Sequence, residues 1–91
     1  MDDASNPRLR QAILEVVDNQ IRDGTPPETR ATLDRLLAEG HARPAAIDLI
    51  AGVVATEIFH VMKSRRPFDE ARFVAALRAL PKPPWNDDGK E

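Results

Sequence analysis

The chain has 91 residues, a length that suits one domain. It has no cysteine, which excludes disulfides and thiolate chemistry. Its 13 Lys and Arg residues stand against 15 Asp and Glu residues, a formal charge of −2. This balance argues against a general nucleic-acid binder, because such proteins normally show a basic excess or a basic face.

The spacing of the apolar residues predicts four helices and no strand. The first helix is expected over residues 7–23, with Asn6 as its cap and Pro7 at the first helical position. Its inward stripe consists of Leu9, Ile13, Leu14, Val16, Val17 and Ile21. The second helix is expected over residues 26–39, with Leu33, Leu36 and Leu37 inward.

The five residues from Gly24 to Glu28 contain the features that end the first helix and begin the second. Gly24 suits the left-handed position just past a helix end, and Gly40 suits the same position after the second helix. Thr25 is expected to be the N-cap of the second helix, with Pro26 at the first helical position. Glu28 stands where its carboxylate reaches back to the N–H of the cap residue.

The third helix is expected to begin near Arg43 or Pro44 and to end near Ser64. It is the longest and most apolar of the four, so it is expected to lie centrally, with other helices packed on more than one side. Gly52 near its middle is explained either by a close approach of another helix or by simple tolerance. The residues expected on its buried side are Ile47, Ile50, Ala51, Val54, Ile58, Val61 and Met62, with Leu49 and Val53 on the flank.

The fourth helix is expected to start at Asp69, a good N-cap, and to end at Pro81. Phe68 and Phe73 have the spacing of a hydrophobic staple. The prediction is therefore an all-α, compact four-helix domain over residues 1–80 with a central apolar third helix. Residues 81–91 are expected to form a proline-rich and then polar C-terminal tail.

We expect no secretory signal at the start of the chain and no transmembrane helix within it. The first residues are acidic and polar, unlike a secretory signal. The apolar stretch at residues 45–62 is interrupted by Asp48, Glu57 and His60, which argues against a transmembrane helix. We therefore expect a soluble cytoplasmic protein with no membrane partner.

The motif Pro26-Pro27-Glu28 followed by T-L-x-R-L-x-x-x-G at residues 32–40 resembles a family of small bacterial all-helical proteins of unknown function. In that family an apolar helix follows, then P-F-D-E and A-L-x-x-L, which match residues 67–70 and 76–80 here. The resemblance covers most of residues 7–80. Because these motifs are largely caps and core positions, the resemblance implies a fold and little chemistry.

Glu57 and His60 form the Glu-x-x-His spacing that helical bundles use for metal sites, and Glu15 or Asp18 on the first helix would supply further oxygens. A di-metal site needs two such motifs and two more carboxylates, whereas the chain has 2 histidines. We therefore expect no metal and no cofactor. Glu57 is expected to be partly buried, either in an ion pair that fixes helix packing or as a perturbed catalytic carboxylate. The arginines considered as its ion-pair partner are Arg30, Arg35 and Arg78.

Two aromatic residues are candidates for an interaction surface. Phe59 lies on the side of the third helix that carries Asp48 and Gly52, so it is expected to be exposed. Trp85 follows two prolines and either folds back on the domain or anchors a partner. The basic cluster Lys63, Arg65 and Arg66 suits a helix C-terminus and would also meet an acidic partner.

Three functional hypotheses follow. The first is a non-enzymatic helical protein-interaction module that binds another protein or a second copy of itself. The alternative is a metal-dependent or carboxylate-based enzyme centred on Glu57 and His60, although the sequence has no nucleophile elbow, phosphate loop or triad signature. The third is a weak nucleic-acid binder that uses the basic cluster and Arg43. Residues 36–47 make a poor helix-turn-helix, however, because the helix that would contact the bases is apolar.

Overall fold

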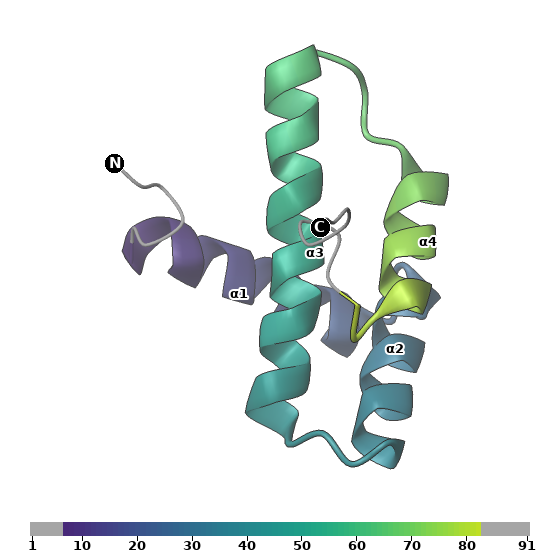
Figure 1. Cartoon of the computed structure of the whole chain (residues 1–91). Coiled ribbons are helices and arrows are strands. Elements are labelled where there is room, and N and C mark those ends of the chain that lie inside the picture. Colours follow the sequence, from purple (N-terminus) through teal and green to yellow (C-terminus); the bar gives the residue numbers. More distant parts are fainter. Residues whose placement is uncertain (1–6, 83–91) are drawn as a thin grey trace.

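Helices make up most of the chain that the computed structural model describes, which is residues 7–82. In this part the elements are α1 (Pro7–Asp23), α2 (Pro27–Ala38), α3 (Arg43–Ser64) and α4 (Glu70–Ala79), with no strand among them (Figure 1). The all-α, four-helix prediction is confirmed. The predicted cap Asn6 and most of the predicted tail, including Trp85, lie outside the described residues.

The third helix is the centre of the fold, because α3 is the longest of the four described helices and has the most buried residues; α2 and α3 each contact all of the other helices. Figure 1 shows α2 and α4 on one side of α3, while the N-terminal part of α1 extends on the other side. Ile50, Val53 and Val54 of α3 are buried in one core with residues of the other helices, including Val17, Leu36 and Leu77. Burying a side chain of this size contributes about 1.5–3 kcal/mol, so this shared core is the main source of stability.

The turn between α1 and α2 confirms one expectation and corrects another. Gly24 has a φ of +68°, and its N–H donates to the carbonyl of Gln20 at 2.8 Å, as the left-handed prediction required. The N-cap of α2, however, is Pro26 and not Thr25. The ring of Pro27 disfavours a helical conformation at the residue before it, so Pro26 stays extended and the helix begins one residue later than predicted. The reach-back from Glu28 does not form, and its buried Oε1 has no hydrogen-bond partner in the described part of the chain.

The other helix ends follow the sequence signals. Gly40 has a φ of +102°, and the N–H of His41 donates to the carbonyl of Leu36 at 3.1 Å. At the start of α4, Oδ1 of Asp69 accepts a hydrogen bond from the backbone N–H of Arg72 at 3.0 Å. The rings of Phe68 and Phe73 lie 5.6 Å apart, which confirms the staple.

Three residues that were predicted to point inward are instead exposed. Val16, Leu37 and Met62 have exposed fractions of 39%, 38% and 69%. Leu37 and Met62 belong to the last turns of their helices, and α3 has 22 residues whereas α2 has 12 and α4 has 10. The neighbours of α3 are too short to cover its C-terminal end, which projects beyond α4 in Figure 1.

By length and composition alone, α3 is also long and apolar enough to cross a membrane. About a third of its most apolar 18-residue stretch is buried in the fold. The core helix of a soluble protein meets the same criterion, and α3 contributes six buried residues to contacts with the other helices. The property is therefore compatible with a soluble protein.

Leu36 and Leu37, near the end of α2, test the described packing, because Leu36 is buried and Leu37 is exposed. We expect Leu36→Ala to lower the free energy of unfolding by about 2–5 kcal/mol, because it opens a cavity in the core. Leu37→Ala, the matched control, is expected to cost less than about 1 kcal/mol. Urea unfolding followed by circular dichroism measures both, and equal losses would contradict the described packing.

Candidate functional site

A buried ion pair joins α3 to α4. Nη2 of Arg72 lies 2.8 Å from Oε2 of Glu57, and Nε of Arg72 lies 3.2 Å from Oε1. The Glu57 side chain is 8% exposed, whereas that of Arg72 is 46% exposed. The pairing is thus bidentate, with the carboxylate inside the fold and the guanidinium at its edge.

The expectation that Glu57 takes part in a packing ion pair is confirmed, but all three candidate partners were wrong. Arg35 instead bonds Glu39 at 3.0 Å and the carbonyl of Leu77 at 3.2 Å, while Arg30 and Arg78 are exposed. The actual partner, Arg72, lies in the first turn of α4, beside the C-terminal half of α3.

The hydrogen bonds to Glu57 raise the pKa of Arg72 above its ordinary value and outweigh the opposing effect of desolvation. The guanidinium therefore stays charged at every physiological pH. A buried carboxylate that accepts two hydrogen bonds from a permanent cation is satisfied structurally.

The residues of the hypothetical metal site do not come together. Glu57 is buried against Arg72, whereas His60, Glu15 and Asp18 are exposed, and Glu15 accepts a hydrogen bond from Gln11 at 3.2 Å. Within residues 7–82, no three His, Asp or Glu side chains form a group that would hold a metal ion. The arrangement therefore gives no geometric support to the enzyme hypothesis.

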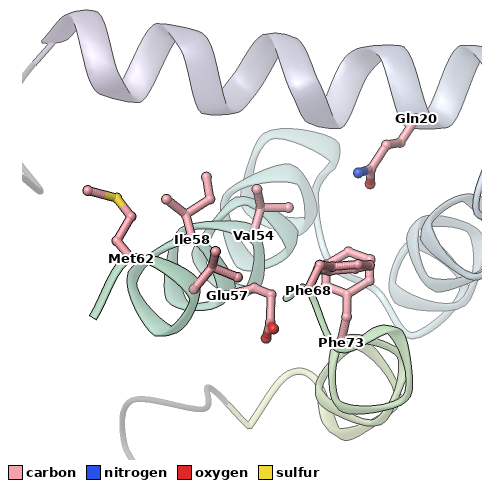
Figure 2. A pocket seen from close by; sticks show the side chains of 8 residues that line it. Gln20, Val54, Glu57, Ile58, Met62, Phe68 and Phe73 are labelled. Carbon is pink, nitrogen blue, oxygen red and sulfur yellow. The ribbon is translucent and has the colours of Figure 1, made fainter. Parts of the chain in front are cut away.

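One apolar groove opens above this ion pair, between α1, α3 and α4. It has a volume of about 290 Å³, and we call it the Phe68 groove. Figure 2 shows Gln20 on α1 facing Phe68 and Phe73, with Val54, Ile58 and Met62 along α3. Among the described residues, Gln20 and Glu57 are the only polar ones that line it, and the side-chain oxygen of Gln20 already accepts a hydrogen bond from Thr29 at 2.9 Å. The Phe68 groove suits an apolar side chain and offers no nucleophile.

A second and larger groove, of about 410 Å³, lies between α1 and the solvent side of α3, and we call it the Phe59 groove. Phe59 is 46% exposed, which confirms the expectation from its position beside Asp48 and Gly52. An exposed ion pair between Arg10 and Asp48, at 3.0 Å, lies at this groove. Its lining consists of Leu9, Arg10, Ile13, Asp48, Ala51, Gly52, Ala55, Thr56 and Phe59.

The predicted basic cluster follows the exposed end of α3. Lys63, Arg65 and Arg66 are all exposed. Arg65 is the C-cap residue and takes a left-handed conformation, with a φ of 58°, and its N–H donates to the carbonyl of Val61 at 2.9 Å. The cluster thus has a structural place at the helix end, while its charges face solvent.

The sequence alone did not identify Met62 and Phe68 as exposed apolar residues, at 69% and 55%. The sequence predicts a packing role for both, since Met62 continues the apolar side of α3 and Phe68 forms the staple. Together with Phe59 they make the C-terminal half of α3 and its following segment the part of the described chain with the largest exposed apolar side chains.

Comparison with known proteins finds no matching family model, no matching curated protein and no matching solved structure. The resemblance to a small bacterial helical family accordingly stays a prediction. The function has to be argued from the site itself.

Removal of the cation that pairs with Glu57 tests the structural role of this ion pair. We expect Arg72→Met to lower the midpoint of urea unfolding at least about twice as much as Arg78→Met, because it leaves a buried carboxylate without its partner. In a Glu57→Leu background the same Arg72→Met change is expected to have little effect. If Arg72→Met is as harmful in that background as in the wild-type chain, the ion pair has no such role.

Proposed function

We propose that the chain is a non-enzymatic helical protein-interaction module that binds through the outer face of α3. We define the outer face of α3 as Asp48, Gly52, Ala55, Phe59 and Met62. The observation that carries the proposal is that this face bears half-exposed Phe59, which lines a groove of about 410 Å³, and largely exposed Met62, which lines the neighbouring Phe68 groove.

The chemistry of this face matches that of protein interfaces. Aromatic residues and Met are enriched at the centres of interfaces, while charged residues lie at the rim. Here Phe59 and Met62 lie between the Arg10–Asp48 pair at one end of the face and the basic cluster, which directly follows Met62, at the other. A helix of the partner is the natural ligand for an apolar groove between two helices.

Other assigned roles fit around this surface. Lys63, Arg65 and Arg66 would meet acidic groups of the partner at the rim, where they affect the association rate more than the affinity. Trp85 lies outside the described residues and stays a candidate second anchor. As part of this proposal we place the protein in the cytoplasm, without a cofactor. No observation favours the metal-dependent alternative, because Glu57 is engaged with Arg72 and is separated from the other candidate ligands.

Site-specific photo-crosslinking in living cells that express the full chain tests the proposal. A benzophenone amino acid in place of Phe59 is expected to give a discrete protein adduct, at least about tenfold more abundant than the adducts from the same probe in place of Arg30. Arg30 is exposed on α2, away from the outer face, and makes a matched control. Met62→Glu is expected to suppress the adduct from position 59, because it puts a charge next to the apolar contact.

Mass spectrometry of the adduct identifies the bound protein, and either a second copy of this chain or a different protein fits the proposal. Adducts from position 59 that equal those from position 30 in amount and variety would overturn it.

A further inference from the structure

The outer face of α3 has the spacing of a helix-pairing seam. Its five members follow one another at intervals of 4, 3, 4 and 3 residues, the pattern that lets one helix lie along another. The face lies opposite the side that packs into the core, where Ile50 and Val54 are buried. The N-terminal part of α1 borders this face, and the Phe59 groove of about 410 Å³ between α1 and α3 is the space in which a second helix would lie.

The sizes of the side chains along this seam are graded. Gly52 and Ala55 come first and are small, whereas Phe59 and Met62 follow and are large and exposed. If a second copy of α3 lies antiparallel on the first, a register that puts Ala55 opposite Phe59 also puts Gly52 opposite Met62. Each large side chain then meets a small one, in both directions at once. A parallel arrangement would instead place like against like, Phe59 against Phe59 and Gly52 against Gly52.

The charges along the seam are also graded, from acidic at the start of α3 to basic at its end. Asp48 is near the start of α3, and Lys63, Arg65 and Arg66 lie at its other end. In the antiparallel register Asp48, which also pairs with Arg10 of its own chain, faces the part of the partner copy that carries the basic cluster. The two helix dipoles also oppose each other in this arrangement, which is favourable. A parallel pair would bring the three cations of each copy together.

From this complementarity we infer that the partner of the outer face is a second copy of this chain, bound with the two α3 helices antiparallel across a two-fold axis near residue 57. The inference rests on the proposed function, because it names the occupant of the same surface. A two-fold axis makes the interface self-complementary, so that the same patch serves both chains. Because a single helix pair is small beside a standard interface of about 1,600 Å², we expect a dissociation constant in the micromolar range.

Disulfide cross-linking tests the orientation, and the chain is suited to it because it has no cysteine of its own. Gly52→Cys and Met62→Cys variants of the full chain, distinguished by mass, are mixed and mildly oxidised. The antiparallel pair is expected to give mainly the mixed disulfide. Identical positions in that pair are ten residues apart along the axis, about 15 Å, which is beyond the reach of about 7 Å that a disulfide spans. Disulfides formed mainly within each variant would overturn the orientation.

Sedimentation equilibrium tests the charge contribution. We expect Asp48→Lys to raise the dimer dissociation constant at least about fivefold, because it replaces the Arg10–Asp48 pair with two cations that face the partner's basic cluster. Asp34→Lys makes the same change of charge at an exposed position of α2 and is expected to leave the dissociation constant unchanged. Circular dichroism of both variants confirms that they are folded.

A chain that sediments as a monomer up to millimolar concentration would overturn the second-copy inference. If the photo-crosslinking probe at position 59 still captures a different protein, the interaction-module proposal stands and only the identity of the partner changes. If neither a dimer nor a captured protein is found, both fail.

Discussion

The structure depends on one constraint: α3 is apolar around almost its whole circumference, and the three described helices that surround it are all shorter. Covering one side of α3 forms the core, in which Ile50, Val53 and Val54 are buried. The other side is only partly covered within residues 7–82, by the N-terminal part of α1, which pairs with Asp48 through Arg10. The exposure of Phe59 and Met62 therefore follows from the same helix that makes the domain stable, and stability and recognition share one element.

The ion pair of Glu57 and Arg72 gives this apolar packing a defined geometry. Apolar contacts alone are tolerant of small rotations, whereas a bidentate pair with a 2.8 Å contact requires α4 to meet α3 at one place. Buried ion pairs do not reliably add stability, because desolvation opposes the attraction. The same pairing explains why an acidic residue in the middle of an apolar helix does not indicate catalysis here.

Much of the fold was readable from local signals, because a cap or a left-handed glycine acts through atoms a few residues away. Gly24, Gly40 and Asp69 all behave as their sequence positions predicted. The predicted start of α2 was wrong by one residue. Both Pro26 and Pro27 suit the first helical position, and in the structure Pro27 occupies it. Contacts between helices were less accessible. The partner of Glu57 depends on the rotation of α4 about its own axis, which helical spacing does not specify, and the exposure of Met62 depends on the relative lengths of neighbouring helices.

Arg72 has two roles in the fold. Its side chain donates hydrogen bonds to Glu57, and its backbone N–H donates to the cap residue Asp69. The start of α4 and its attachment to α3 are therefore specified by the same turn. A change at position 57 or 72 alone would leave the other side chain without its partner, so we expect the two positions to vary together. Homologous chains should keep a carboxylate and a guanidinium there together, exchange the two as a pair, or replace both with apolar residues in concert, and such covariation would trace descent of this fold even where little other sequence similarity survives.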